Sequence, residues 1–281
     1  MKECRLCPFN CGINRENKYG VCGLDNKINI SKTMLHMWEE PCISGEEGSF
    51  AMFFTGCNLK CVFCQNYEIS GNDCKNSKVY SEEELAELML NVKEAHTISL
   101  ISPTPYIPQI AKAIRIAKEK GLNKPIVYNT NSYENVESVK LLDGLIDIYL
   151  PDLKYFDDEL SMKYSKAPKY FYNATNAILE MLKQVGEEKL IIRHLCLPGH
   201  IEDSKKILDW IYNNLPSNIR ISLMAQYFPT HKANEYNEIN RKITKREYDS
   251  IVNYYFNLGL ENGFIQELEA ASDKYVPKFS Q

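Results

Sequence analysis

Apolar runs with strand character alternate with amphipathic helical stretches over most of the chain. The runs are nearly continuous in Ile, Leu, Val, Phe and Tyr, which is typical of strands buried on both faces of a sheet. Six of them are predicted as strands, at 49–55, 97–102, 125–130, 146–154, 189–197 and 218–227. The helices predicted between and after them are 81–95, 106–120, 134–142, 175–185, 203–213 and 245–258.

This alternation predicts an α/β fold with a parallel sheet. The helix at 81–95 has the clearest start, because Ser81 and Glu84 have the spacing of a capping box. Consecutive parallel strands connect through right-handed crossovers, so the six repeats indicate a partial (β/α)6 barrel. In such barrels the chemistry collects on the loops at the C-terminal ends of the strands.

The first 45 residues differ from the rest, since they are polar, rich in cysteine and without a sustained hydrophobic period. We therefore divide the chain into a small cysteine-rich, metal-binding extension at 1–45 and a partial barrel at 46–281.

Composition and charge narrow the possible partners. The chain has 281 residues and a formal charge of −4, so no basic surplus indicates nucleic acid, and the lysine-rich stretch 242–246 is interpreted as a solvated helix start. No apolar run reaches the roughly 18 residues of a membrane span, and the N-terminus has no hydrophobic signal core. We expect a cytoplasmic protein with no membrane or nucleic-acid partner, whose ten cysteines are reduced and available for metals.

Three cysteines follow the first predicted strand. The string GCNLKCVFCQN places Cys57, Cys61 and Cys64 at the expected mouth of the barrel. Three thiolates at this spacing suit an iron–sulfur cubane with one iron left unligated, where a substrate or cofactor binds. A zinc site, a disulfide with a spare thiol, and buried unliganded thiols are the alternatives.

The CxxxCxxC spacing, with Phe63 before the last cysteine, resembles the cluster loop of the radical S-adenosylmethionine (SAM) superfamily. Asn66, two places after the last cysteine, is similar to an asparagine in the signature of glycyl-radical-enzyme activases, the group that includes the pyruvate formate-lyase activating enzyme. The resemblance covers most of residues 49–231. It implies a radical SAM barrel, a [4Fe–4S] cluster on the three cysteines, and SAM bound at the open iron.

Later strands end in motifs that resemble the activase segments in contact with SAM. YLPDLKYFD is similar to an aspartate-x-lysine element, which points to Asp152 and Lys154. A carboxylate can accept hydrogen bonds from SAM and a lysine can neutralise its carboxylate, although a surface ion pair is the alternative. IIRHLCLPGH and MAQYFPTH resemble segments that carry an arginine and a histidine near SAM, which suggests Arg193 and His231.

Two positions depart from the activase pattern. The Gly-Gly-Glu element that receives the amino group of SAM is replaced by SLISPTPY, where Ser102 and Thr104 offer hydroxyl acceptors instead. Asn129 stands where activases tend to have an aspartate. Cleavage of SAM remains the expected reaction, and the substrate remains open.

A second cysteine set precedes the barrel, with the spacing C-x2-C-x3-C-x10-C: Cys4, Cys7, Cys11 and Cys22. Four thiols can hold a structural zinc ion or a second iron–sulfur cluster, and free thiols are the third possibility. The remaining cysteines, Cys42, Cys74 and Cys196, have the features of ordinary thiols.

The resemblance implies a radical SAM oxidoreductase that works under anaerobic conditions and generates a glycyl radical on a partner glycyl radical enzyme. A flavodoxin- or ferredoxin-type protein is the expected reductant. One alternative keeps SAM cleavage but acts on a peptide side chain or small metabolite. The other, from a different class, is a non-catalytic scaffold that binds zinc or an iron–sulfur cluster.

Overall fold

The computed structural model describes residues 3–71, 77–272 and 276–279, so Cys74 lies outside the described residues. All six predicted strands are confirmed, and each is parallel to its neighbours in the predicted series. β2 (Ser49–Phe54), β4 (Thr97–Ile101), β5 (Ile126–Thr130) and β6 (Ile148–Pro151) pair in that order. The parallel series then continues through β7 (Ile191–Leu195), β8 (Arg220–Met224) and β9 (Gly263–Ile265).

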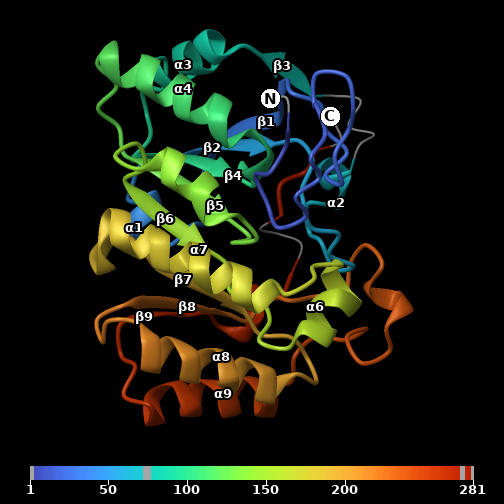
Figure 1. Ribbon diagram of the computed structural model, residues 1–281. Coiled ribbons are helices and arrows are strands. Elements are labelled where there is room, and N and C mark those ends of the chain that lie inside the picture. The colour runs from blue at the N-terminus through green and yellow to red at the C-terminus, as the bar shows by residue number, and fades with distance from the viewer. Residues whose placement is uncertain (1–2, 72–76, 273–275, 280–281) are drawn as a thin grey trace.

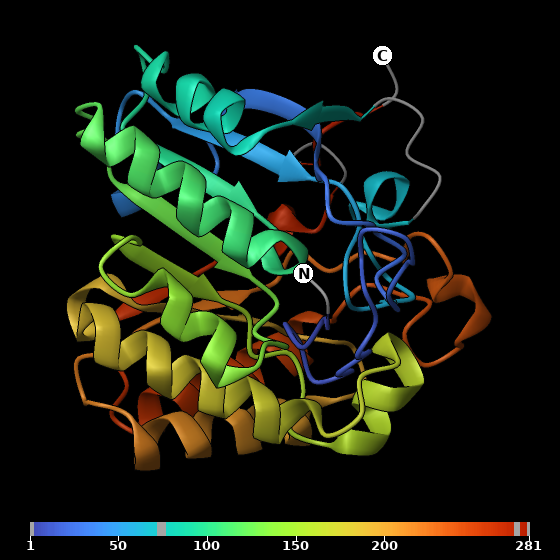
Figure 2. The same cartoon turned by 45° about the horizontal axis from the view of Figure 1, so that its top comes forward.

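Two isolated parallel bridges join these two groups of strands. Tyr149 of β6 pairs with Leu190, and Asp152 pairs with Arg193 of β7. The sheet is therefore the predicted partial barrel, with β6 beside β7 and the C-terminal ends of all its parallel strands at one mouth (Figures 1 and 2).

The helices lie along the outer side of this curved sheet (Figures 1 and 2). The longer ones are α3 (Glu82–Leu90), α4 (Ile107–Glu119), α7 (Tyr170–Val185), α8 (Ile201–Asn214) and α9 (Lys245–Asn257). The capping box predicted for α3 is present, since the Ser81 hydroxyl accepts from the N–H of Glu84 and the Glu84 carboxylate accepts from the N–H of Ser81. The predicted helix at 134–142 is shorter, because only α5 (Val136–Val139) is α-helical there and a 3-10 turn follows.

Several elements were not predicted. The region expected to lack a sustained period contains β1 (Ile28–His36), which pairs antiparallel with β2, and β3 (Lys78–Tyr80) pairs antiparallel with β1. The hydrophobic pattern does not reveal β1, because most of the residues of this strand are only half-buried. The unpredicted helices are short: α1 (Pro41–Ser44), α2 (Tyr67–Ser70) and α6 (Asp158–Ser165).

The ninth strand depends on a glycine. β9 has three residues, too few for a hydrophobic pattern, and it lies against β8. A Cβ at Gly263 would lie 2.0 Å from the carbonyl oxygen of Ile221, so only glycine allows the two backbones to approach this closely. Six described residues of the C-terminal segment line the barrel cavity: Phe264, Gln266, Ala270, Ser272, Val276 and Pro277.

The bottom of the barrel is closed by α1. Ile43 is fully buried against Val127, Leu150 and Ile191, which lie on β5, β6 and β7. At the opposite end, the N-terminal coil lies near the ends to which the strand arrows point (Figure 2). It is fixed there by Asn135, whose N–H donates to the carbonyl of Leu6 and whose side chain donates to that of Arg5.

Candidate active site

The three-cysteine loop is pinned to the rest of the protein by its backbone. The N–H groups of Lys60 and Val62 donate to the carbonyls of Ser165 and Tyr164, at 3.0 and 2.8 Å, and the carbonyl of Val62 accepts from Lys232. Ser165 and Tyr164 end α6, which has a sharp start because Asp157 caps it. The unpredicted helix α6 therefore positions the loop.

Each of the first two thiols receives hydrogen bonds. The Cys57 sulfur accepts from the N–H of Leu59 and the side-chain amide of Asn131, both at 3.4 Å. The Cys61 sulfur accepts from the Ser165 hydroxyl at 3.0 Å, and that hydroxyl also bonds the hydroxyl of Tyr155 at 2.7 Å. Donors directed at cysteine sulfur favour the thiolate and tune the potential of a cluster bound to it.

The three thiols also influence one another electrostatically. Burial raises the pKa of Cys57 to about 11 and that of Cys64 to about 12, and repulsion between the thiolates adds to both effects. Burial also raises the pKa of Cys61, while the ammonium group of Lys154 opposes the rise at both Cys57 and Cys61. Thiols that are close, buried and reluctant to ionise are stabilised as thiolates by cationic iron, so this donor set fits a cubane.

Within the described residues, no three His, Cys, Asp or Glu side chains converge on a point where one metal ion would bind. A cubane has a different requirement, because each thiolate binds a separate iron at its own corner.

A cavity of about 420 Å³ lies beside the thiols and opens at the barrel mouth. Ten residues predicted for the site line it: Cys57, Cys61, Phe63, Cys64, Asn66, Ser102, Asn129, Asp152, Lys154 and Arg193. They come from the loops after β2, β4 and β6 and from β5 and β7 themselves. Ser102 has a φ of 58°, a left-handed conformation that is rare for residues other than glycine and is often found at functional sites.

Two predicted residues are not brought to this cavity. The hydroxyl of Thr104 is buried and donates to Glu134 at 2.7 Å, on the helix side of the sheet. His231 is exposed, and its ring stacks on that of Tyr67 with 5.0 Å between centroids. Glu134 also accepts from Tyr128 and Thr130, and burial raises its pKa.

Asp152 and Lys154 form an ion pair at the end of β6. The Lys154 ammonium donates to Asp152 Oδ2 at 2.6 Å, and the two side chains are 16% and 18% exposed. Although burial acts to lower it, the pKa of Lys154 lies above its ordinary value because of the Asp152 carboxylate and the nearby thiols. Tyr170 supports both residues, since its hydroxyl donates to the Asp152 carbonyl and accepts from the Lys154 N–H.

Arg193 has partners that the sequence did not indicate. It donates from Nε and Nη2 to the two carboxylate oxygens of Glu40, at 2.8 and 2.6 Å, and it also pairs with Glu39. Both carboxylates line the cavity near its floor. Arg193 therefore pairs with two buried acidic groups between β1 and α1, and its guanidinium is not free although the residue lines the cavity.

Other cavity residues come from parts of the chain that carried no motif. Asn131 contacts the Cys57 sulfur, and Phe264 and Gln266 reach the cavity from β9 and the residue after it. Ser165 contacts the Cys61 sulfur but is not among the residues that line the cavity. Only the position of Asn131 just after a predicted strand could have suggested its role. The four cysteines of the N-terminal coil are not among the described residues that line the cavity.

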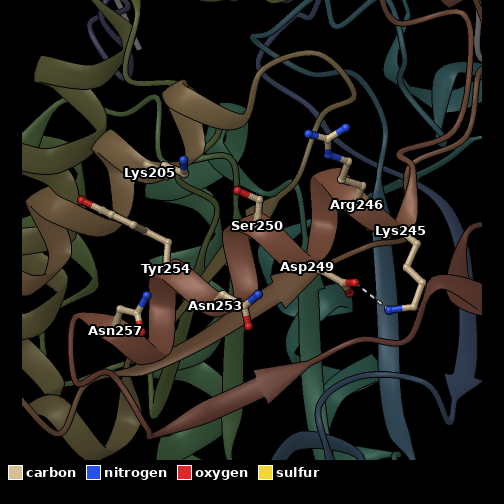
Figure 3. Close-up of a pocket in the computed structure, with 8 residues that line it drawn as sticks. All are labelled: Lys205, Lys245, Arg246, Asp249, Ser250, Asn253, Tyr254 and Asn257. Carbon is tan, nitrogen blue, oxygen red and sulfur yellow. Dashed lines mark hydrogen bonds and ion pairs between the residues drawn. The ribbon is translucent and has the colours of Figure 1, made fainter.

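A second hollow of about 790 Å³ lies on the outer surface along α8 and α9 (Figure 3). Its lining includes Lys205, Arg246 and the ion pair between Lys245 and Asp249, which measures 2.6 Å. No cysteine or histidine is part of the lining described. Lys245 is the first residue of α9, so the lysine-rich stretch is the solvated helix start that the sequence predicted.

The fold and the cavity define a class: a partial parallel (β/α) barrel with three thiols on the loop after its first parallel strand. The sequence model of the Radical SAM superfamily matches residues 52–211, which is more than half of the chain. An uncharacterized protein of Methanocaldococcus jannaschii, MJ0674, is 34% identical over 260 residues, covering 88% of this chain and 72% of that protein. The chain therefore belongs to the Radical SAM superfamily, whose members use SAM and a [4Fe–4S] cluster.

More distant relatives agree with this placement. The pyruvate formate-lyase-activating enzyme of Clostridium pasteurianum is 25% identical over 214 residues, covering 71% of this chain and 83% of that enzyme. Streptococcus suis SuiB, solved with a precursor peptide SuiA, has a TM-score of 0.51 and 17% identity over 76% of this chain. The chain spans about half of SuiB, namely 47% of its length. TYW1, solved with a lysine-pyruvate adduct, also has a TM-score of 0.51, at 13% identity over 82% of this chain and 83% of TYW1.

None of the helices in the described part of the chain has the length and apolar character needed to cross a lipid bilayer.

Proposed function

We propose that this chain cleaves SAM reductively and uses the radical to generate a glycyl radical on a partner enzyme. The observation that carries the cleavage is that Cys57, Cys61 and Cys64 line one cavity together with the Asp152–Lys154 pair. When bound, the [4Fe–4S] cluster would supply one electron to SAM, giving methionine and a 5′-deoxyadenosyl radical that abstracts a hydrogen atom from the substrate. A flavodoxin- or ferredoxin-type protein would deliver that electron.

The side chains around the cavity have separate tasks in this proposal. Asn131 and Ser165 hold the cysteine sulfurs by hydrogen bonds and orient the thiolates. Lys154 presents its charge to the carboxylate of SAM, and Asp152 holds the lysine in place.

The remaining predicted residues of the cavity would border SAM itself. Ser102 follows β4 and Asn129 lies near the C-terminal end of β5, which suits polar contacts to its amino group and ribose. Phe63 is held edge-on against Tyr227, with ring centroids 5.6 Å apart, and Asn66 lies beside the last cysteine. We assign these four residues to SAM binding.

The activase role rests on the relative from Clostridium pasteurianum, whose similarity extends over 83% of that enzyme's length. The aspartate-x-lysine element that resembles an activase segment, Asp152 and Lys154, also lines the cavity. A glycyl radical enzyme is accordingly the proposed partner.

SAM cleavage is tested first. The protein is reconstituted anaerobically with iron and sulfide, reduced, mixed with SAM and assayed for 5′-deoxyadenosine, with Cys61→Ala as the variant and Cys42→Ala as the matched control. We expect product from the native protein and from Cys42→Ala, since Cys42 is not among the described residues that line the cavity, and none from Cys61→Ala. Equal product from Cys61→Ala would show that the three-thiol site is not the reaction centre.

The target is tested separately. A candidate glycyl radical enzyme encoded near this chain is incubated with the active protein and SAM, and electron paramagnetic resonance detects the radical. A glycyl radical that forms only with SAM and intact Cys61 supports the activase role. Abundant 5′-deoxyadenosine without that radical, together with a covalently changed peptide, favours the alternative of peptide modification that the fold of SuiB with its precursor peptide suggests.

A further inference from the structure

The N-terminal coil holds four thiols that the proposed reaction does not use. Residues 3–27 contain no helix or strand, and short hydrogen bonds set their course instead. The Cys4 N–H donates to the carbonyl of Ile13, and its carbonyl accepts from Gly12, both at 2.9 Å. The carbonyl of Cys7 accepts from the N–H of Asn10 at 2.9 Å. These turns fold the first three cysteines back on one another.

The fourth cysteine joins them. Cys22 interacts electrostatically with Cys4 and Cys11, and Cys7 interacts with both Cys11 and Cys22. A Cβ at Gly20 would lie 3.4 Å from the Cys22 sulfur and 3.6 Å from the Cys11 sulfur. Both sulfurs thus lie beside Gly20, which has no side chain, and the electrostatic interactions link Cys4 and Cys7 to them.

A buried cation without a carboxylate partner accompanies this group. Arg15 is 0% exposed, and its guanidinium donates to the backbone carbonyls of Pro105 and Asp25. Its Nε has no hydrogen-bond partner among the described residues, and none of the ion pairs between described residues includes Arg15. The Asp25 carboxylate instead accepts from the N–H of Lys27 at 2.9 Å. Because burying a charge is costly unless an opposite charge balances it, Arg15 needs an anion nearby.

The four cysteines of the N-terminal coil are the neighbours that can supply this negative charge. Arg15 interacts electrostatically with Cys22. A free thiol is neutral near pH 7, whereas a thiol bound to a metal loses its proton, and four thiolates around zinc or a cubane leave the centre net negative. We propose that Cys4, Cys7, Cys11 and Cys22 bind a second metal centre, separate from the three-thiol site, and that Arg15 is the buried cation that balances its charge. No three of these described thiols converge on one point, so binding would draw the ligands closer, since metal binding and local ordering are coupled in segments without secondary structure.

The second centre borders the three-thiol loop. Asn58 is 2% exposed; its side chain contacts the Cys7 thiol and donates to the carbonyl of Tyr133 at 2.7 Å. It also accepts from Asn131 at 2.9 Å, and Asn131 donates in turn to the Cys57 sulfur. One buried asparagine therefore lies between the two cysteine sets, so that loss of the N-terminal metal should disturb the three-thiol loop. This last consequence rests on the proposed function, while the metal centre does not.

Metal content of the full chain tests the site without any need for SAM cleavage. The variant C57A/C61A/C64A removes the three-thiol site, and iron, sulfide and zinc are then measured per chain after anaerobic purification and reconstitution. We expect bound metal, and its loss when Cys7→Ala and Cys22→Ala are added. Iron with sulfide identifies a cluster and a single zinc identifies a structural ion, and either supports the centre. A folded triple variant without metal overturns it.

If the triple variant does not fold, the native chain answers the same question by its metal content. The iron of one cubane and no zinc would overturn the proposal, whereas additional iron or zinc would support it.

The role of Arg15 is tested by a cycle of stability measurements. Arg15→Met is compared with the native chain in the metal-loaded and metal-free states, by thermal unfolding and by the rate of metal loss to a chelator. We expect metal to leave the variant about tenfold faster, and the mutation to destabilise the loaded protein more than the metal-free protein. Arg15→Lys keeps the positive charge, so it should lose metal more slowly than Arg15→Met. Arg5→Met, at a side chain that is 66% exposed, should change neither the stability nor the rate of metal loss. Equal destabilisation in both states would make Arg15 a structural residue only.

Discussion

The two cysteine sets have nearly mirrored spacings but very different surroundings. Cys57, Cys61 and Cys64 are separated by three and then two residues, whereas Cys4, Cys7 and Cys11 are separated by two and then three. The first set lies beside a cavity with a buried ion pair, on a loop pinned by α6. The second lies in a coil without helix or strand, outside the described lining of the cavity, with Arg15 beside it.

The comparison shows that spacing selects a ligand type, while the surroundings decide what the bound group can do. An open position next to a cavity gives a small molecule access to a metal, as in catalytic sites. Four thiols that saturate a metal are typical of closed sites that stabilise a segment or store charge. Four substitutions can break or sharpen this contrast.

The largest effect is expected from a cysteine of the cavity. Cys64→Ala should lower 5′-deoxyadenosine formation by about 1,000-fold or more, because losing even a hydrogen-bond partner of a metal ligand costs about 10- to 100-fold. Cys11→Ala, in the coil, should leave a measurable fraction of the activity. Rates from anaerobic assays separate the two, and equal losses would contradict the division of the cysteines into an open and a closed site.

Removing the charge of Arg193 should mainly affect stability. Arg193→Met should lower the free energy of unfolding at pH 7 by about 3–5 kcal/mol, the usual cost of breaking a buried pair, since Glu39 and Glu40 side chains are only 8% and 6% exposed. Urea denaturation gives this value. Lys140→Met is the control, because the Lys140–Glu137 pair is exposed and such pairs contribute about 1 kcal/mol or less.

The contribution of Glu40 to stability should depend on pH in opposite directions in the native protein and in Arg193→Met. Burial acts to raise the pKa of Glu40, but the Arg193 guanidinium prevails and holds it below its ordinary value. This contribution to stability is therefore present above the unfolded pKa of about 4.3 and is lost as the pH falls through the folded value. In Arg193→Met burial is opposed only by hydrogen bonds from Ser222 and the backbone, so the variant should lose stability as the pH rises from about 4.3 towards neutrality. Parallel pH profiles of the two proteins would refute the pairing.

Lys154 should affect the binding of SAM. Lys154→Gln removes one charge-assisted hydrogen bond, worth about 1.5–3 kcal/mol, so the Kd for SAM should rise about 10- to 100-fold. Calorimetry on the reconstituted protein gives the Kd, and Lys205→Gln on α8, paired with Glu202 at 2.8 Å, is the control. An unchanged Kd would assign the Asp152–Lys154 pair to structure alone.

The smallest effect is expected from the hydroxyl beside Cys61. Ser165→Ala removes a hydrogen bond of 3.0 Å to the cysteine sulfur and should lower the rate of SAM cleavage about tenfold. Ser165→Thr retains the hydroxyl and serves as the matched control. If both variants react at the native rate, the hydroxyl does not tune the site.

The sequence predicted the repeating part of the molecule well. All six apolar runs form parallel strands, because burial on both faces leaves a continuous pattern that one sequence displays directly. Ten predicted residues line one cavity, because the ends of parallel strands meet at the same edge of a sheet. Both findings depend on local pattern and on the geometry of parallel strands.

Other parts escaped prediction for physical reasons. β1 is half-buried along most of its length, β9 has three residues, and α6 is short, so their patterns are weak. Thr104 and His231 have suitable side chains at suitable positions, but the backbone directs one towards Glu134 and the other towards Tyr67. Contacts that join distant segments, such as Arg193 with Glu39, leave no periodic signal.

The sequence by itself determined the order of strands and helices, the three-cysteine loop and its place at the barrel mouth, since each depends on residues close together in the chain. Only the tertiary structure decided which side chains face the cavity, that Arg193 is neutralised, and that Arg15 is buried beside thiols and without a carboxylate partner among the described residues. The physical reason is that burial and charge pairing depend on which distant segments pack together. A side chain's chemistry is local, but its electrostatic environment is set by the whole fold.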